Sequence, residues 1–326
     1  MMYISEINYN SIITPLLIFI SMISLTSNSL LFNWIILEIN LMLFLSNLIL
    51  DNCSFFYSFS SSLIYFIVQS FSSSILLTSL ILNMLNLNYK MNLINIMFLI
   101  SLMIKINMFP FHMWMMKLCV MINWIQFWIL STIQKIIPLM MLSNLNFKLI
   151  MLVSLINMIG GGILGLNKIL LMKIFTSSSI YHLGCLLLLI KMMKLFWFIY
   201  FLIYSTLMLT LSLKFNKFNI KNTMQMFSNK NTLIKFIILS IAGLPPLWGI
   251  MIKWLSMQTL MYFINMMMMM LIFMISSLLN FFFYLKLILN SSTMNSNQKK
   301  INQKYSFIKF MMIILLINPL SLNMYY

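Results

Sequence analysis

Apolar runs long enough to cross a lipid bilayer recur along the chain from Ser11 to Tyr325. A membrane-spanning helix needs about 20 predominantly apolar residues, and it satisfies its own backbone hydrogen bonds because the bilayer core holds no water. Of the 326 residues, 62% are hydrophobic and 7% are charged, whereas soluble domains are roughly half apolar and a quarter charged. The sequence therefore predicts an all-α polytopic membrane protein in which residues 1–326 form a single transmembrane domain.

Polar loops divide the apolar runs into about eleven expected transmembrane helices. The longest loops are expected at residues 215–232 and 290–304, which are rich in Asn, Lys and Ser. The expected spans are residues 8–25, 29–49, 58–84, 92–116, 121–143, 147–167, 170–190, 195–214, 233–255, 258–289 and 305–325.

The choice of apolar residues indicates which genome encodes the protein. Ala242 is the only alanine, arginine is absent and methionine occurs 36 times, although alanine is the best helix former. A strongly AT-rich gene disfavours alanine codons, and a genetic code with a second, AT-rich methionine codon raises the methionine content. Animal mitochondrial genomes have both properties, so we expect a protein of the mitochondrial inner membrane.

The charge balance predicts topology and not nucleic-acid binding. The 20 lysines and three acidic residues give a formal net charge of +17, but most lysines lie in loops between expected spans, where basic residues set orientation. Eleven spans place the termini on opposite sides, and the loops on the N-terminal side hold more of the lysines. The positive-inside rule therefore predicts the N-terminus in the matrix and the C-terminus in the intermembrane space.

Two apolar segments contain helix-breaking residues close to a lysine. Residues 91–122 would form a straight helix of about 48 Å, against about 30 Å of hydrocarbon, and Pro110 lies within this tract. Prolines remove backbone donors and interrupt helices. The second segment, "LSIAGLPPLWGIMIKW", carries its breaking residues at Gly243, Pro245 and Pro246.

The two expected breaks fall in different halves of the chain. Discontinuous helices at corresponding places in two halves indicate an inverted repeat, with the transport pathway at the breaks. The halves are expected at approximately residues 8–143 and 147–289, followed by a C-terminal helix at 305–325. We therefore expect an antiporter-like inverted repeat with two discontinuous helices.

Four ionisable residues lie well inside expected spans: Glu38, Lys105, Lys135 and Lys253. A charge at the bilayer centre costs roughly 2.5–3.5 kcal/mol on insertion scales, so intramembrane charges usually mark ion or proton paths. The alternative, a head group that extends to the interface, applies best to Lys253 near the end of its span. One acid among three lysines predicts a Glu–Lys pair, in which attraction favours the charged lysine and desolvation favours the neutral one. Such a lysine can load and release a proton, whereas arginine stays charged.

Polar residues inside the spans are candidates for a water chain. Ser178 and His182 lie on one face of an expected helix, and a neutral imidazole can relay protons. Hydrogen bonding between helices is the alternative role. His112, just after Pro110, is expected to cap carbonyls that the break frees.

Cysteine and glycine spacings predict structural roles. The three cysteines share no metal-ligand spacing, so we expect no metal site, disulfide framework or iron–sulfur cluster in this chain. The glycines of "GGGILG", residues 160–165, predict close packing of two helices.

In combination these motifs resemble one family, the proton-pumping membrane subunits of respiratory complex I, which are akin to cation/proton antiporters. The family has a Glu in an early span, a Lys before a Pro-Phe-His-x-Trp break, a Gln-Lys-x-x-Pro helix, a Ser-Ser-Ile-x-His-x-Gly segment, and a Gly-Leu-Pro-Pro break followed by Lys-Trp. The matching residues are Glu38, Lys105 before "PFHMW", Lys135 in "QKIIP", His182 in "SSIYHLG", and Lys253 with Trp254 after "GLPP". The motifs follow the family order over about residues 29–290.

The resemblance implies a proton-translocating membrane-arm subunit of NADH:ubiquinone oxidoreductase, coupled to quinone reduction elsewhere in the complex through these buried charges and water. It also implies that neighbouring membrane-arm subunits and membrane lipid are the partners. NADH, flavin, iron–sulfur clusters and quinone would be bound by other subunits, so that this chain holds no redox centre. The length resembles the smaller animal member of the family, of the insect type. Two alternatives stay open: a stand-alone cation/proton antiporter and a structural spacer of the membrane arm.

Overall fold

The computed structural model of the chain describes residues 2–293, apart from residue 28 and residues 51–54, 86–90, 146, 167, 193–195, 229–231, 245–246 and 262–266. The described residues form helices, with an isolated antiparallel bridge between Leu170 and Asn222. The helices are α1 (Met2–Thr26), α2 (Leu30–Ile49), α3 (Phe55–Met84), α4 (Met91–Ile106), α5 (Met113–Leu118), α6 (Trp124–Ser131), α7 (Ile133–Leu142), α8 (Phe147–Gly165), α9 (Leu171–Met192), α10 (Phe196–Lys217), α11 (Thr223–Ser228), α12 (Thr232–Ala242), α13 (Gly249–Met261) and α14 (Met267–Thr293).

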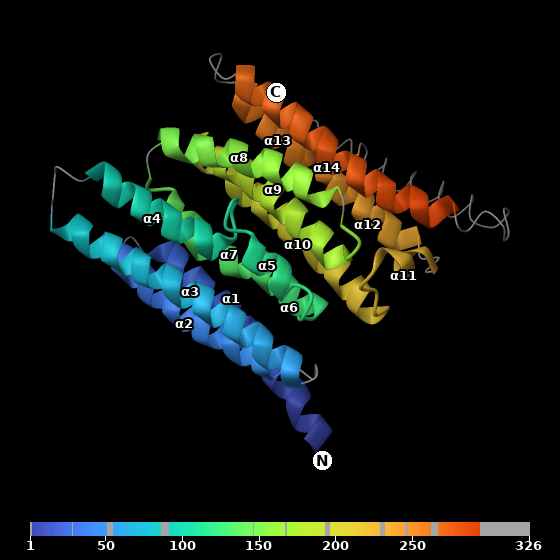
Figure 1. Cartoon of the computed structure of the whole chain (residues 1–326), viewed down its shortest axis with the longest axis horizontal. Helices are drawn as coiled ribbons and strands as arrows, with labels where there is room; N and C mark the ends of the chain where they lie inside the picture. Colours follow the sequence, from blue (N-terminus) through green and yellow to red (C-terminus); the bar gives the residue numbers. More distant parts are fainter. Residues whose placement is uncertain are drawn as a thin grey trace.

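The helices form one bundle whose long members run side by side. The helices α1 to α3 lie at one edge, and α13 and α14 lie at the opposite edge (Figure 1). Among the described residues, six helical stretches are long and apolar enough to cross a membrane: Leu30–Ile49, Phe56–Met84, Trp124–Leu142, Leu171–Lys191, Phe196–Lys217 and Met268–Ile288. The expected C-terminal helix at 305–325 lies outside the described residues.

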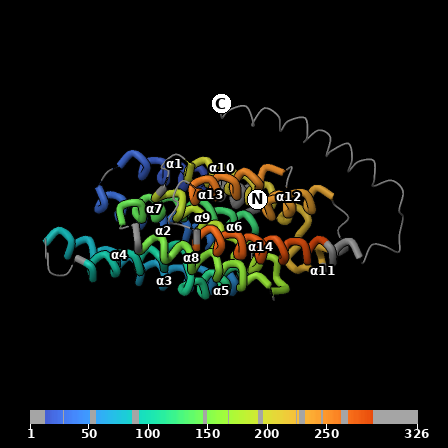
Figure 2. Tube along the Cα trace, turned by 90° about the horizontal axis from the view of Figure 1, so that it is seen from above, coloured from blue at the N-terminus to red at the C-terminus, as the bar shows by residue number. Residues whose placement is uncertain are grey.

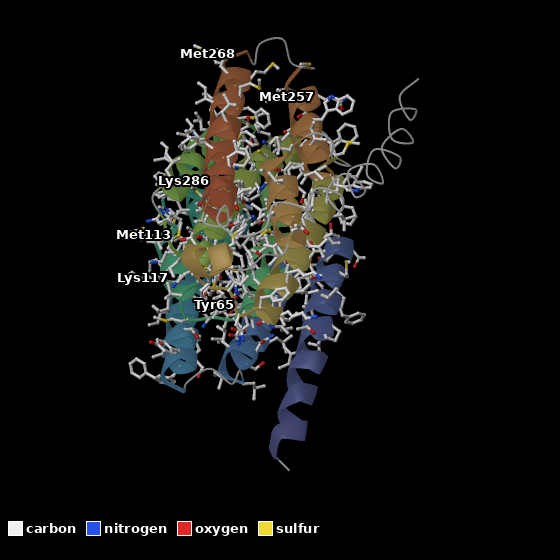
Figure 3. All side chains as sticks on the ribbon, turned by 90° about the vertical axis from the view of Figure 1, so that its right-hand side faces the viewer. Tyr65, Met113, Lys117, Met257, Met268 and Lys286 are labelled. Carbon is white, nitrogen blue, oxygen red and sulfur yellow. The ribbon has the colours of Figure 1, made fainter. Side chains whose placement is uncertain are left out.

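Large apolar side chains cover the outside of the bundle, as expected where lipid replaces water. Phe56 is 78% exposed, Met268 is 74% exposed and Leu278 is 64% exposed. Figure 3 shows Met268 at one end of α14, with apolar side chains along the outer surface. A soluble protein rarely exposes such contiguous apolar surface, so this outside fits a membrane.

The helix α9 lies at the centre of the bundle and contacts α6, α8, α10 and α13 (Figure 2). Every residue from Leu171 to Ile190 is buried except Lys173. The helix α8 packs against α9 through glycines: a Cβ on Gly161 would lie 2.5 Å from the backbone nitrogen of Tyr181, and one on Gly184 would lie 2.7 Å from the carbonyl oxygen of Ser154. The prediction that the "GGGILG" glycines serve close packing is confirmed.

Both expected helix breaks are present. The helix α4 ends at Ile106 and α5 begins at Met113, with Pro110 in the connection. The helix α12 ends at Ala242 and α13 begins at Gly249. Gly243 turns the chain at φ +75°, a conformation that glycine adopts without steric cost. Pro245 and Pro246 lie outside the described residues.

One expected span contains an interruption that the sequence does not predict, and one expected boundary is wrong. The expected span 121–143 corresponds to the membrane-length stretch Trp124–Leu142, but it is interrupted at Thr132, where φ is −125° and ψ is −77°, so that α6 ends and α7 begins there. The Thr132 hydroxyl donates to the Trp128 carbonyl at 2.7 Å, and such local bonds compete with regular helix geometry. The expected span 258–289 also begins inside α13, which continues to Met261.

Candidate functional site

Glu38 and Lys105 form an ion pair between α2 and α4. The distance from Lys105 Nζ to Glu38 Oε1 is 4.0 Å, and the side chains are 2% and 31% exposed, respectively. Lys105 lies in the last turn of α4, just before the first break. Gln69 of α3 donates to the carbonyl of Lys105 at 3.3 Å. The expected proximity of Glu38 to a buried lysine is therefore present in the structure.

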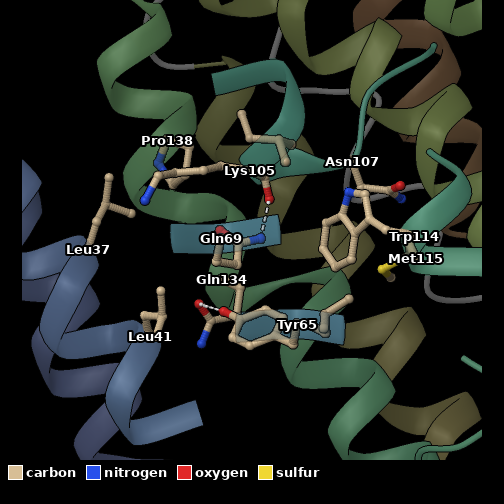
Figure 4. Close-up of a pocket in the computed structure, with 12 residues that line it drawn as sticks. Leu37, Leu41, Tyr65, Gln69, Lys105, Asn107, Trp114, Met115, Gln134 and Pro138 are labelled. Carbon is tan, nitrogen blue, oxygen red and sulfur yellow. Dashed lines mark hydrogen bonds between the residues drawn. The ribbon is translucent and has the colours of Figure 1, made fainter. Parts of the chain in front are cut away.

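A small polar cavity adjoins this pair. Its volume is about 20 Å³, which accommodates about one water molecule. Tyr65 donates to Gln134 Oε1 at 3.4 Å, and Gln134 Nε2 donates to Asn40 Oδ1 at 3.2 Å. Figure 4 shows Lys105, Gln69, Gln134 and Tyr65 around the cavity. The cavity thus lies between α4 and α7, which contribute Lys105 and Gln134 to its lining.

Two side chains hydrogen-bond to the backbone of the first break: Asn157 of α8 and His112 within the break itself. The Phe109 N–H donates to Asn157 Oδ1 of α8 at 2.7 Å. His112 Nδ1 lies 3.0 Å from the Pro110 carbonyl and stacks on Phe109 with ring centroids 5.2 Å apart. The expectation that His112 satisfies a carbonyl at the break agrees with this hydrogen bond. The sequence did not identify Asn157, although a lone amide in an apolar helix needs a partner when buried.

Lys135 lies in the first turn of α7, where the Thr132 interruption creates a helix start. Its side chain is 3% exposed, and within the described part of the chain its Nζ has no hydrogen-bond partner. The positive end of the α7 dipole adds to the unfavourable surroundings of a positive charge at this position. A buried lysine without an anion is suited to transient charging, since neither charge state is locked by a partner.

His182 occupies the middle of α9 and is buried there. It interacts electrostatically with both Lys253 and Lys135. Its Nδ1 lies 2.8 Å from the Tyr200 hydroxyl, and its ring packs on that of Tyr204 with centroids 4.8 Å apart. Ser178, one turn earlier on the same helix, donates to its own helix at the Phe175 carbonyl. His182 is thus hydrogen-bonded to α10 and lies within electrostatic range of both lysines, while Ser178 binds the backbone of its own helix.

Lys253 points into the second break. Its Nζ donates to the carbonyl of Ala242, the last residue of α12, at 2.6 Å. The ammonium also lies 5.9 Å from the centroid of the Phe281 ring, within reach of a cation–π interaction. A Cβ on Gly243 would lie 2.6 Å from Lys253 Cε, so the glycine makes room for this side chain. The head group therefore turns towards the carbonyl that the break frees, which favours the pathway interpretation over extension to the interface.

The residues expected from the sequence therefore form two groups. The first consists of Glu38 and Lys105 with the cavity beside them. The second consists of Lys135, His182 and Lys253, which are linked electrostatically. Tyr200 belongs to the second group and was missed, because a tyrosine in an apolar span carries no signal of its partner.

Comparisons with known proteins agree with this arrangement. A family model described as the transmembrane region of NADH:quinone oxidoreductase and Mrp antiporter proteins matches residues 27–280. NADH-ubiquinone oxidoreductase chain 2 of Anopheles gambiae is 38% identical over 262 residues, which cover 77% of this chain and 76% of that protein. The protein of the same name from Aedes aegypti is 36% identical over 263 residues, covering 77% of each chain.

Two solved structures are similar in fold. A chain of respiratory complex I from Thermus thermophilus with bound aureothin gives a TM-score of 0.68 at 18% identity, covering 79% of this chain and 64% of that chain. A chain of the Mrp complex from Dietzia sp. DQ12-45-1b gives a TM-score of 0.67 at 14% identity, covering 81% of this chain and 57% of that chain. This chain thus spans less than two thirds of either matched chain, and the likeness concerns the fold.

Proposed function

We propose that this chain, which belongs to the NADH:quinone oxidoreductase/Mrp antiporter family, is a proton-translocating membrane-arm subunit of NADH:ubiquinone oxidoreductase. The mosquito relatives carry the name of chain 2 of that complex and agree with the mitochondrial, insect-type composition. The observation that carries the proposal is the Glu38–Lys105 ion pair at 4.0 Å beside a polar cavity. Buried charges of this kind usually mark proton paths.

In the proposed path, Glu38 controls how strongly Lys105 holds its proton. Energy from quinone reduction elsewhere in the complex changes the pairing of the two residues, and the proton moves towards Lys135 through water in the cavity. His182 connects Lys135 with Lys253, and Lys253 lies at the second break. Freed backbone groups at such breaks are tolerated inside a membrane where protein or a water-filled cavity surrounds them.

The same proposal includes the finer architecture. We infer about eleven transmembrane helices in an inverted repeat, with halves at approximately 8–143 and 147–289 and a further helix at 305–325. One broken helix in each half, with Lys105 at one break and Lys253 at the other, supports this inference. The loop lysines support an N-terminus in the matrix and a C-terminus in the intermembrane space.

We infer that this chain contains no redox centre and no cofactor, and that other subunits of the complex bind NADH, flavin, iron–sulfur clusters and quinone. Its partners are then neighbouring antiporter-like membrane-arm subunits and lipid, without nucleic acid. The alternative is a stand-alone cation/proton antiporter, which the fold similarity to an Mrp complex favours. Co-purification with NADH dehydrogenase activity supports the complex, and isolation of an active chain without that activity supports the antiporter.

The test of proton translocation is Lys135→Met in the assembled complex. Methionine keeps most of the side-chain volume and removes the proton carrier, so NADH-driven proton uptake by reconstituted vesicles should fall at least about tenfold. The control is Lys286→Met, because Lys286 is exposed on the outside of α14 (Figure 3). Normal assembly, turnover and pumping by Lys135→Met would support a structural spacer and contradict the proposal.

A further inference from the structure

We propose that Tyr200 is a positioning residue for His182, which it holds by Nδ1 so that Nε2 is the ring atom available to the proton path. This inference rests on the proposed function. It concerns a residue of α10 that belongs to none of the sequence motifs. It also assigns α10 a role in the proposed path, whose other residues lie on α2, α4, α7, α9 and α13.

The contact between the two residues is direct and buried. His182 Nδ1 and the Tyr200 hydroxyl oxygen are 2.8 Å apart, and the residues are 2% and 1% exposed, respectively. In contrast, Nε2 of His182 is buried without a hydrogen-bond partner among the described residues. The two nitrogens of one imidazole therefore have different roles: one is engaged by the protein, and the other remains for exchange.

The hydrogen bond also fixes the orientation of the ring. An imidazole can turn about its side-chain torsions and can exchange its proton between the two nitrogens. A bond at Nδ1 favours one orientation and links the tautomer to the Tyr200 hydroxyl, in the way that an outer partner orients a functional histidine. Packing of the Tyr204 ring, with centroids 4.8 Å apart, supports the same orientation.

The charged groups around His182 make the position of its free nitrogen, Nε2, important for the proposed proton path. Lys135 from α7 and Lys253 from α13 both act electrostatically on His182. Among the described residues, the other titratable groups around the ring are its neighbours Tyr181 and Cys185 on α9, together with Tyr200 and Tyr204 on α10. The Tyr200 hydroxyl also contacts the Cys185 thiol. These groups are neutral in their ordinary forms near neutral pH, so the two lysines supply the variable charge. A ring held at Nδ1 keeps Nε2 in a constant position relative to both lysines.

A purely structural role for Tyr200 makes a different prediction. If the hydroxyl only stabilised packing between α9 and α10, its loss would act whether or not residue 182 is a histidine. If Tyr200 acts through the imidazole, its effect disappears once the imidazole is gone. A double-mutant cycle separates these cases, because it measures the coupling between two positions.

The experiment measures NADH:quinone turnover and proton uptake by vesicles containing the intact complex. Tyr200→Phe should lower both by about two- to tenfold, the range that corresponds to one net hydrogen bond. The control is Tyr57→Phe, which removes the hydroxyl of a tyrosine that is 54% exposed on α3 and should change neither. In a His182→Met complex, adding Tyr200→Phe should cause no further loss.

Two results would overturn the inference: wild-type turnover and pumping by Tyr200→Phe, or losses that multiply in the double variant. Lys135→Met is measured in parallel. If it pumps normally, the proposed function fails; if it is inactive while Tyr200 shows no coupling to His182, only the inference fails. A cryo-EM map of the wild-type complex tests the contact even if Tyr200→Phe does not assemble, since a separation beyond about 3.5 Å between Nδ1 and the hydroxyl would refute it.

Discussion

Replacing Glu38 by Gln tests the electrostatic core of the proposed path. Two unit charges 4.0 Å apart attract each other by about 4 kcal/mol at an effective dielectric constant of about 20. Because the Glu38 side chain is 31% exposed, we reduce this attraction by about half for screening by solvent. The remaining attraction of about 2 kcal/mol corresponds to a factor of about 30. Proton-coupled turnover should therefore fall about 30-fold if charging of Lys105 limits the cycle.

Glu38→Asp provides a graded control at the same position. Aspartate keeps the charge but is shorter by one carbon–carbon bond, about 1.5 Å. At a separation of about 5.5 Å the attraction is about 3 kcal/mol before screening. The same reduction by half leaves a loss of about 0.5 kcal/mol, or about two- to threefold in rate. The expected order of activity is therefore Glu, then Asp, then Gln.

The assay compares turnover and proton uptake of the three complexes in sealed vesicles, with and without an uncoupler. Equal assembly on native gels ensures that the rates refer to equal amounts of complex. Equal pumping by all three would refute the reasoning, because the charge at position 38 would then have no role. A stronger defect in Glu38→Asp than in Glu38→Gln would also refute it, since side-chain shape would then matter more than charge.

Three further substitutions test how the helices are held. Gly161→Ala places a Cβ 2.5 Å from the backbone nitrogen of Tyr181 and should destabilise the chain by about 1–3 kcal/mol. Gly162→Ala places a Cβ 3.1 Å from the Cβ of Leu279, a contact that a small shift relieves, and should cost less; equal thermal stability of the two complexes would contradict this packing. Asn157→Leu removes the acceptor of the Phe109 N–H and should cost about 1–3 kcal/mol, measured as a lower unfolding temperature together with slower turnover. An unchanged unfolding temperature would show that another group satisfies this donor.

The long spans were predictable because a membrane helix needs little beyond a continuous apolar run between polar loops. The expected spans 29–49, 58–84 and 195–214 correspond closely to α2 (Leu30–Ile49), α3 (Phe55–Met84) and α10 (Phe196–Lys217). Where polar loops are absent, the same reasoning fails. The methionine-rich sequence after Met261 contains a single turn-forming residue, Asn265, within an otherwise apolar run, so the sequence marks the boundary between α13 and α14 only weakly.

Helix breaks were predictable only where a residue enforces them chemically. Pro110 cannot donate a backbone hydrogen bond, and Gly243 adopts φ +75°, so both mark an interruption in the sequence itself. The interruption at Thr132 has no such mark, because threonine is common in regular membrane helices. The Thr132 hydroxyl donates to the Trp128 carbonyl there, but Ser256 makes the same kind of bond to Ile252 inside the uninterrupted α13, so the interruption depends on packing and not on this bond alone.

Partners of buried polar groups were the least predictable part of the site. Glu38 could be paired with a lysine by counting charges, since the chain has three acids. Asn157 and Tyr200, by contrast, obtain their roles from residues of other segments: Phe109 in the connection between α4 and α5, and His182 on α9. The need for a hydrogen bond is predictable for any buried polar group, whereas its partner depends on how the helices pack.

The three buried lysines differ in what stabilises their charge, and this difference suggests an order for the proposed path. Lys105 faces the carboxylate of Glu38, and Lys253 binds the Ala242 carbonyl beside the Phe281 ring. Lys135 has no hydrogen-bond partner among the described residues, and no carboxylate is paired with it there. A proton that moves from Lys105 to Lys253 therefore passes through the position that holds it least. Such an intermediate limits the rate unless water or His182 lowers its free energy, which is why the orientation of His182 should affect turnover.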